Sequence, residues 1–328
     1  MQFDSFIGNR KIIERLRTKL RQDRFPHGLI FSGPEGVGKY FCALMLAKAL
    51  NCRNAEPGDF CDACTSCRRI AEGIHPDVMR ISVEEDATQI KVAQIRQVLG
   101  LLELQPLEGR NKVFILDPAN ALNPEAANAL LKGLEEPPEN SVLVLITVNV
   151  HELLLTVRSR CQVYHFTPLS LDEIRRQGMT DELAVRWSQG SIGRARALDI
   201  ARLKSEREIM LDFVGTVLNA RAEQFQELLS ASAELGRAKQ DFESRITVLS
   251  VLLADMLYLK ENAADRLVNI DLRERLLKMV EGVSVDRLLK MVEFIGFIEL
   301  SLKTYVNRQM LTDVLAVTGN ETAAAWLQ

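Results

Sequence analysis

The first half of the chain alternates short apolar runs with stretches of helical periodicity. Three runs, His27–Phe31, Lys112–Leu116 and Ser141–Val148, predict buried strands. Tyr40–Leu50 and Asn123–Leu134 have the composition of helices, and the second is followed closely by two prolines that end it. Strands that alternate with helices predict an α/β fold, a parallel sheet with helices on both faces.

After Pro168 the strand-like runs stop and the apolar spacing becomes helical. Residues 169–202 predict a few short helices, and longer helices follow from about Ser205. The breaks between them are expected near four residues, namely Gly236, Asn262, Gly282 and Gly319. We therefore expect three domains: an α/β domain over 1–166 with an insert over about 50–70, a small helical domain over 167–204, and an all-helical domain over 205–328.

Composition adds limits on function. The 328 residues are 47% hydrophobic and 26% charged, an ordinary globular mixture, and the formal net charge is −3. A protein that grips nucleic acid alone usually carries a basic surplus. We therefore expect any DNA contact to be shared with partners or confined to a patch.

Two apolar stretches are the best candidates for a membrane span, and both are too short. Val142–Val150 predicts a buried strand, and Val248–Leu259, which contains Asp255, predicts a buried helix. The first residues lack the apolar segment of a signal peptide. We expect a soluble, cytoplasmic protein with no membrane contact, in which the six cysteines stay reduced and need a role other than disulfides.

The segment 33–39 (GPEGVGK) lies between a predicted strand and a predicted helix and fits the Walker A pattern. Gly33, Gly36 and Gly38 would let backbone N–H groups close around phosphate oxygens, and Lys39 would reach the outer phosphates. The alternative is a chance glycine-rich turn, which the strand–loop–helix context disfavours. The next residue is Tyr40, where the pattern requires a Ser or Thr hydroxyl that ligates Mg²⁺.

Four cysteines follow the spacing C-x8-C-x2-C-x2-C, at Cys52, Cys61, Cys64 and Cys67. Such close steps allow four thiolates to meet one small cation, which predicts a structural zinc site closed to substrate. An iron–sulfur cluster uses the same four thiolates, and four unligated thiols are the plain alternative. The insert around them is rich in turn residues and has little apolar content, so a metal would stabilise it.

The chain resembles the clamp-loader branch of the AAA+ proteins, which includes bacterial gamma/tau, delta-prime and replication factor C subunits. The segments that carry the resemblance are 27–39, the four-cysteine insert, 128–147, 156–162 and 190–198. The resemblance implies an AAA+ domain followed by a helical lid and a helical collar domain. The C-terminal third matches only in general character.

The resemblance also defines what the nucleotide site has lost. Val113–Asp117 is an apolar run that ends in an acid, as in Walker B, and Asp117 would help to hold Mg²⁺. The AAA+ pattern then requires a Glu that activates water, and this chain has Pro118. The losses at Tyr40 and Pro118 resemble the delta-prime group and imply a subunit without ATPase activity of its own. Whether ATP still binds is left open.

Further site residues are assigned only by the resemblance. It implies that Arg160, in the motif Ser159–Cys161, is an arginine finger that acts on the ATP of a neighbouring motor subunit. Pattern alone does not choose between Arg160 and Arg158, and a surface ion pair is the plain alternative. Thr147 and Arg194 stand at the sensor 1 and sensor 2 positions, where structural roles are the alternative.

The implied partners are the gamma/tau motor subunits and the delta subunit, with the sliding clamp and primer-template DNA reached through the complex during DNA replication. Leu288–Leu302 could supply an apolar assembly surface or serve as ordinary core. The competing functions are a working gamma/tau-like ATPase, which would need substitutes for Tyr40 and Pro118, and a zinc-dependent DNA-binding protein that acts alone. The net charge and the closed cysteine set disfavour the latter.

Overall fold

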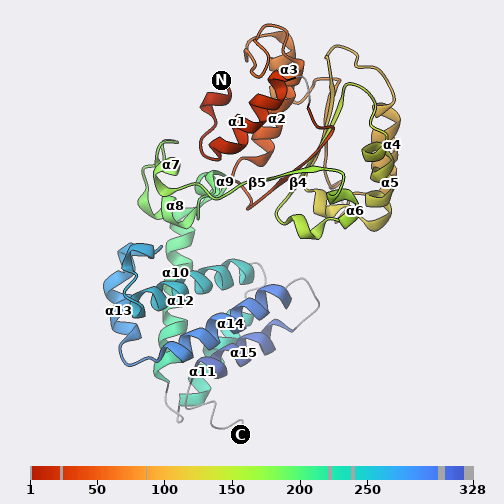
Figure 1. Cartoon of the computed structure of the whole chain (residues 1–328). Coiled ribbons are helices and arrows are strands. Elements are labelled where there is room, and N and C mark those ends of the chain that lie inside the picture. The colour runs from red at the N-terminus through yellow and green to blue at the C-terminus, as the bar shows by residue number, and fades with distance from the viewer. Residues whose placement is uncertain are drawn as a thin grey trace. The chain divides into compact units, whose positions relative to one another are not determined.

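The computed structural model describes residues 2–22, 25–85, 87–220, 224–237, 241–301 and 307–320 (Figure 1). It divides into two compact units, one of Met1–Thr180 with Ser188–Arg196 and the other of Asp181–Trp187 with Ala197–Gln328. The segment 167–204, expected as a separate small domain, contributes to both units. The three-domain division remains a prediction.

A five-stranded parallel sheet forms the centre of the first unit, in the order β2-β3-β4-β1-β5. The strands are β1 (Gly28–Ser32), β2 (Val78–Ile81), β3 (Lys112–Leu116), β4 (Ser141–Thr147) and β5 (Gln162–His165). The predicted α/β fold is confirmed, and the three predicted strands lie within one residue of their expected bounds. The two edge strands, β2 and β5, were not predicted.

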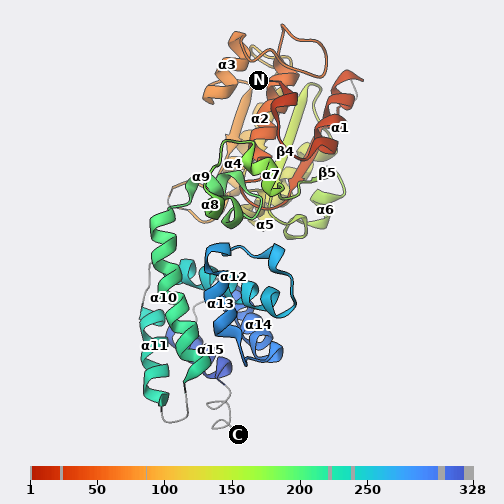
Figure 2. The same cartoon turned by 90° about the vertical axis from the view of Figure 1, so that its left-hand side faces the viewer.

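Helices cover both faces of this sheet (Figure 2). Side chains at alternate positions of β3 divide between two cores: Val113 and Ile115 pack with the helices α1 to α3, and Phe114 and Leu116 pack with α4 to α6. The helices of this unit are α1 (Arg10–Arg21), α2 (Lys39–Asn51), α3 (Thr65–Glu72), α4 (Val92–Leu102), α5 (Pro124–Glu135), α6 (Leu155–Arg158), α7 (Leu171–Arg175) and α9 (Ile192–Ala197).

The second unit is helical throughout its described residues, as expected. Its helices are α8 (Glu182–Trp187), α10 (Ile200–Asn219), α11 (Phe225–Arg237), α12 (Phe242–Lys260), α13 (Arg273–Val280), α14 (Val285–Ser301) and α15 (Arg308–Gly319). A buried polar network joins four of its segments: Asp255 accepts hydrogen bonds from the backbone N–H and the side-chain amide of Asn269, whose Oδ1 accepts from Trp187 Nε1 and Arg207 Nη1. Among the described helices, none is both long and apolar enough to cross a membrane.

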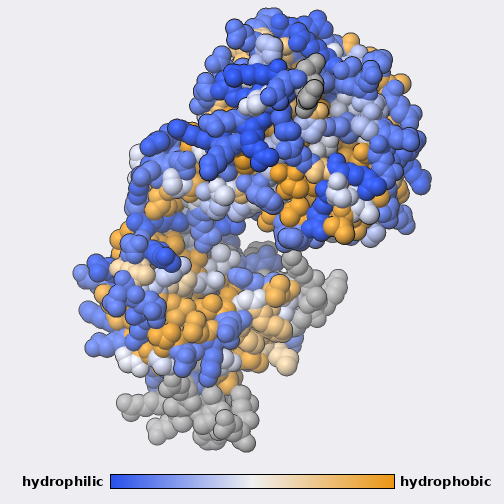
Figure 3. Space-filling model, viewed as in Figure 1, coloured by the Kyte–Doolittle hydropathy of each residue, from blue (hydrophilic) through white to orange (hydrophobic). Residues whose placement is uncertain are grey.

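The helix α14 corresponds to the segment that was expected to form either an assembly surface or part of the core. Some of its side chains are buried and others are exposed. Leu288, Met291, Ile295 and Ile298 are buried in the core of the second unit. On the other face, Leu289, Phe297 and Leu300 are 43%, 54% and 73% exposed. Hydrophobic side chains gather over α14 in Figure 3. Leu302 lies outside the described residues.

Candidate functional site: a phosphate loop, an exposed arginine and a four-cysteine cluster

The phosphate-loop segment connects the carboxyl end of β1 to the start of α2. Gly33, Gly36 and Gly38 all have positive φ angles, of 149°, 70° and 95°, which favour glycine. Gly36 has no room for a side chain, because a Cβ there would lie 2.2 Å from Ser191 Oγ. The N–H of Gly193 donates to the carbonyl oxygen of Gly36 at 3.2 Å. The predicted loop conformation is therefore present and depends on its glycines.

Lys39 is buried and directed back onto its own loop. Its Nζ donates to the carbonyl oxygens of Gly33 and Pro34, the latter at 2.6 Å. Burial lowers the pKa of Lys39, and the carboxylates of Asp117 and Glu35 oppose that shift. The ammonium group therefore satisfies two carbonyl oxygens of its own loop.

A pocket of about 380 Å³ opens beside this loop. It brings together Lys39, Tyr40, Asp117, Pro118 and Thr147, all singled out from the sequence. Thr147, the last residue of β4, is buried, and its hydroxyl donates to the carbonyl oxygen of Asn149 at 3.0 Å. That hydroxyl is therefore engaged in a turn at the end of the strand.

Arg80 also reaches this site, although sequence reasoning missed it. Its Nη2 lies 2.9 Å from Asp117 Oδ2, and its guanidinium carbon lies 4.6 Å from the centre of the Tyr40 ring. Arg80 is a charged residue in the strand β2, two positions after buried Val78. This spacing places Arg80 on the face of the sheet that α2 covers, and it is the feature of the sequence that could have pointed to Arg80.

A Mg²⁺ ion does not fit the residues around this pocket. Mg²⁺ requires oxygen ligands in near-octahedral geometry. Tyr40 carries no hydroxyl close to the backbone, and the Asp117 carboxylate is already paired with Arg80. Pro118, joined to Asp117 by a cis peptide bond, has no group that can activate water.

Arg194 is not among the residues that line this pocket. It lies on α9, and its Nη1 donates to Gln189 Oε1 at 3.2 Å. Arg196, on the same helix, lines a separate pocket of about 490 Å³ on the other side of the loop, together with Phe6 and Phe41. The sensor role of Arg194 remains a prediction.

Arg160 lies at the opposite end of the sheet from the phosphate loop. It precedes β5, whose first residue, Gln162, pairs with Leu29 at the amino end of β1. Its Nη2 lies 2.7 Å from Glu135 Oε1, and its Nη1 donates to the carbonyl oxygen of Thr156 at 3.0 Å. The side chain is 36% exposed and therefore remains accessible to solvent.

Arg158, the alternative to Arg160, makes a different contact. Its Nη1 donates to His151 Nδ1 at 2.9 Å, and its Nε is buried without a hydrogen-bond partner. His151 and Arg158 belong to the short segment 150–158, so this contact is local. Of the two arginines, Arg160 bridges between separate elements, at the carboxyl end of α5 and the start of β5.

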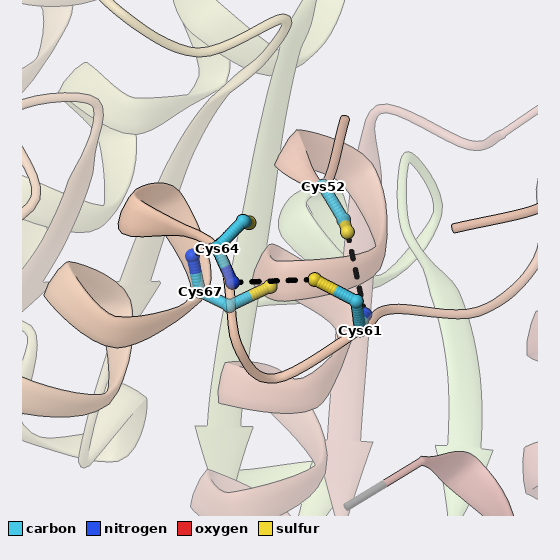
Figure 4. A group of neighbouring side chains, drawn as sticks. All are labelled: Cys52, Cys61, Cys64 and Cys67. Atoms are coloured by element: carbon cyan, nitrogen blue, oxygen red, sulfur yellow. Dashed lines mark hydrogen bonds between the residues drawn. The ribbon is translucent and has the colours of Figure 1, made fainter. Parts of the chain in front are cut away.

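The four cysteines converge beyond the carboxyl end of α2 (Figure 4). Cys52 caps that helix, Cys64 caps α3, and Cys67 lies in its first turn. All four sulfur atoms lie within 4.8 Å of one another. Backbone N–H groups point at three of them: Cys61 N donates to Cys52 Sγ, Cys64 N to Cys61 Sγ and Cys67 N to Cys64 Sγ, at 3.3, 3.3 and 3.5 Å. The predicted ligand set is therefore assembled.

The electrostatics of this cluster differ from one thiol to the next. Hydrogen bonds from backbone amides, that of Ala63 foremost, lower the pKa of Cys61 to about 6, whereas burial raises the pKa of Cys67. Asp62, with a positive φ of 56°, turns the chain between two ligands, and its carboxylate pairs with Lys48. A tetrahedral Zn²⁺ with Zn–S bonds of about 2.3 Å separates its sulfurs by less than the 4.8 Å found here, so the set can close on one ion.

The remaining two cysteines lie outside the cluster, as expected. Cys42 is buried in the core on the α2 face, and Cys161 packs on the opposite face of the sheet. Burial raises the pKa of Cys161 to about 12. Both are ordinary thiols of the core.

Two family models match the chain. The model described as "DNA polymerase III, delta subunit" matches residues 8–170, and that described as "DNA polymerase III, delta subunit, C terminal" matches residues 207–317. Together they cover most of both units.

Known proteins agree with these models. The DNA polymerase III subunit delta-prime of Bacillus subtilis is 30% identical over 271 residues, which span 80% of this chain and 81% of that protein. The tau subunits of Bacillus subtilis and Escherichia coli are 35% and 36% identical over 58% and 53% of this chain. The chain spans only about a third of the former and a quarter of the latter.

Among solved structures, a gamma-subunit-related protein of Thermotoga maritima matches with a TM-score of 0.46 and 19% identity, over 95% of this chain and 99% of that one. This similarity is weak, and the assignment rests on the sequences. The match to a delta-prime subunit over four fifths of both chains, together with the two family models, shows that the chain belongs to the DNA polymerase III delta and delta-prime subunit family.

Proposed function

We propose that this chain is the delta-prime subunit of a DNA polymerase III clamp loader, and that it does not hydrolyse ATP itself. The observation that carries the proposal is the state of the phosphate-loop pocket. Its Walker B acid, Asp117, is paired with Arg80, and Pro118 stands where a water-activating acid is needed. The similarity to a delta-prime subunit over most of both chains supports the same function.

Arg160 is proposed as the group through which the chain acts on ATP. It lies at the amino end of β1, and its own phosphate loop lies at the carboxyl end, so it cannot reach its own pocket. A guanidinium supplied in trans neutralises charge on the phosphoryl group and accelerates transfer by about 10³–10⁵-fold in other systems. Hydrolysis in the neighbour would then require correct assembly with this chain.

The proposed partners follow from the family. They are the gamma/tau motor subunits and the delta subunit, with the sliding clamp and primer-template DNA engaged through the complex. The helical second unit would join the assembly, and the exposed side chains of α14 are the proposed contact. The lid and sensor roles of residues 167–204, including Arg194, belong to the same proposal.

The cysteine cluster is proposed to hold structural zinc. A mean Zn–S length of about 2.3 Å suits four sulfurs within 4.8 Å of one another, whereas an iron–sulfur cluster places several atoms between them. Four protein ligands leave no open position on the ion. Its role would be to hold the end of α2, the loop 53–63 and α3 together.

The function is tested with a loader reconstituted from this chain, its motor subunits and the delta subunit. We expect Arg160→Ala to lower clamp- and DNA-stimulated ATP hydrolysis by about 10³-fold at the one nucleotide site that Arg160 contacts. The total rate of the complex should fall by the fraction of hydrolysis that this site contributes. The measurement is steady-state phosphate release, with complex formation checked by gel filtration.

Arg158→Ala is the matched control, because it removes a neighbouring arginine with only a local contact. We expect it to leave the rate nearly unchanged. Hydrolysis by the isolated chain, together with no effect of Arg160→Ala in the intact complex, would instead establish a gamma/tau-like motor and overturn the proposal.

A further inference from the structure

Three side chains from separate elements meet at the carboxyl edge of the sheet. Tyr40 comes from the first turn of α2, Arg80 from β2, and Asp117 from the residue after β3. The guanidinium of Arg80 contacts both of the others, with the Asp117 carboxylate at 2.9 Å and the Tyr40 ring centre at 4.6 Å. Arg80 therefore links the two positions at which a phosphate loop normally holds its metal.

Strand register places these groups on one face. Arg80 follows Val78 at a spacing of two, and Asp117 follows Ile115 in the same way; Val78 and Ile115 both lie in the core beneath α2. The ladder between the strands continues to this edge, because Asp117 N donates to the carbonyl oxygen of Ile81 at 2.9 Å. The meeting of Arg80 with Asp117 thus follows from the backbone.

Each contact is modest by itself. The Arg80 side chain is 50% exposed, so its ion pair with Asp117 is partly screened by water. Stacking on Tyr40 adds a planar cation–π contact, which an arginine makes better than a lysine. The three features act together: the hydroxyl ligand is missing, the carboxylate ligand is occupied, and a positive charge lies between these two positions.

We propose that the Arg80 guanidinium takes the place of the divalent cation at this phosphate loop, so that the pocket does not hold a Mg²⁺–nucleotide complex. This inference deepens the proposed absence of hydrolysis, since it names the residue that blocks the metal. Pro118 removes the chemistry of water activation, whereas Arg80 acts earlier, on the binding of the metal with its nucleotide.

The test uses the full-length chain and a fluorescent ADP analogue, titrated in metal-depleted buffer and again with 1 mM Mg²⁺, on the order of cellular levels. No chelator is added, because a chelator would strip the cysteine site. The variants are Arg80→Gln, Tyr40→Thr and the two combined. Arg80→Lys is the matched control, because it keeps the charge and loses the planar stack.

For the wild-type chain and for Arg80→Lys, we expect that Mg²⁺ does not raise the affinity for the ADP analogue. A chain that binds no analogue with or without Mg²⁺ also meets this expectation. The combined variant, with a hydroxyl at position 40 and a free Asp117, should bind the analogue at least about tenfold more tightly with Mg²⁺ than without it. Tyr40→Thr alone should gain less, because Arg80 still opposes the ion.

Two results would overturn the inference. One is Mg²⁺-dependent binding by the wild-type chain, and the other is a combined variant with no Mg²⁺-dependent gain. Each variant is first checked for folding by thermal unfolding. Should the combined variant unfold, Arg80→Gln alone decides the matter through electron paramagnetic resonance with Mn²⁺ and ADP: bound Mn²⁺ above the wild-type amount supports the inference, and none refutes it.

The binding experiment is independent of the loader experiment. Arg160 lies at the other end of the sheet, so loss of its effect on the assembled ATPase would refute the proposed function and leave the metal result unchanged. Conversely, if Mg²⁺ does not raise the affinity of the combined variant for the analogue, the role of Arg80 is refuted. The effect of Arg160→Ala on ATP hydrolysis by the reconstituted loader would still test the proposed function.

Discussion

Individual side chains around the cysteine cluster show how a short insert obtains its shape. The ammonium of Lys48, on α2, pairs with Asp62 and lies 5.6 Å from the centre of the Phe60 ring. These contacts hold the turn between Cys61 and Cys64 before any ion is considered. A metal bound there would add a further restraint on this loop.

Removal of one ligand should therefore release the ion and loosen this loop. We expect Cys64→Ser to lower the zinc content from about one ion per chain to a small fraction, because a hydroxyl is a poor substitute for a thiolate. The midpoint of thermal unfolding should fall by about 5–10 °C. Metal content is measured by atomic absorption on protein purified without chelators.

Cys161→Ser provides the comparison at the same scale. Cys161 has a half-buried thiol outside the cluster, so its replacement should leave the zinc content at the wild-type level. Equal zinc contents in Cys64→Ser and Cys161→Ser would show that the four-cysteine set does not hold the ion. Iron in place of zinc would support the cluster alternative.

At the scale of elements, a buried carboxylate anchors the loop between α4 and β3. Asp77, just before β2, accepts hydrogen bonds from the backbone N–H groups of Leu107, Glu108 and Gly109 at 2.7, 2.8 and 2.7 Å. Burial opposes its ionisation, but these three amides outweigh burial and lower the pKa of Asp77. The charged carboxylate therefore stabilises the folded state.

Substitution of this group should have an effect that depends on pH. Because the pKa of Asp77 is lower in the folded state, its contribution is complete above the unfolded value of about 4 and is lost as pH falls through the folded value. We expect Asp77→Asn to reduce the free energy of unfolding at pH 7 by about 2 kcal/mol. Urea unfolding at pH 7 and pH 3 checks this.

The difference between the two proteins should shrink at the lower pH, which lies below the unfolded pKa of Asp77, about 4. A penalty that is equal at both pH values would mean that shape, and not charge, is what the loop requires. Asp172→Asn is a useful control, since that carboxylate is 76% exposed and pairs with its neighbour Arg175 on the same helix.

The central strands could be predicted from the sequence because they are largely apolar. β1, β3 and β4 are buried on both faces, so their composition alone distinguishes them. The edge strands gave no such signal: β2 contains Arg80, and β5 is partly exposed along its length. Their pairing depends on neighbours far away in sequence, which periodicity does not report.

The candidate site divides in the same way. The glycines, Lys39 and the four cysteines could be found because each set lies within one short segment and its spacing has chemical meaning. Arg80 belongs to no such motif: its spacing from Val78 indicates only the face of the strand, and it meets Asp117 only after two strands pair. The role of Arg160 came from resemblance, and the structure supplies its contact with Glu135.

At the scale of the whole molecule, the second unit exposes apolar side chains on the outer face of α14. Phe297 and Leu300 are more than half exposed, while Ile295 and Ile298, on the other face of the helix, are buried in the core. Large apolar side chains left in water are common at assembly surfaces, where a few aromatic residues contribute most of the affinity.

A charge introduced at this face should weaken assembly without unfolding the unit. We expect Phe297→Glu to reduce the affinity for the motor and delta subunits by at least about tenfold, because a buried unpaired carboxylate is costly. Leu277→Glu, at a 43% exposed position of α13, is the matched control. Sedimentation of the mixed subunits measures the complex, and similar losses for both variants would argue against a specific role for α14.

The placement of Arg160 and the phosphate loop at opposite ends of β1 also gives the molecule a polarity. Under the proposed function, subunits that each donate an arginine from one end and receive one at the other would associate head to tail, all in one orientation. A subunit that donates an arginine but has no nucleotide to be acted on would then be expected at one end of such an assembly, with a motor subunit on one side only.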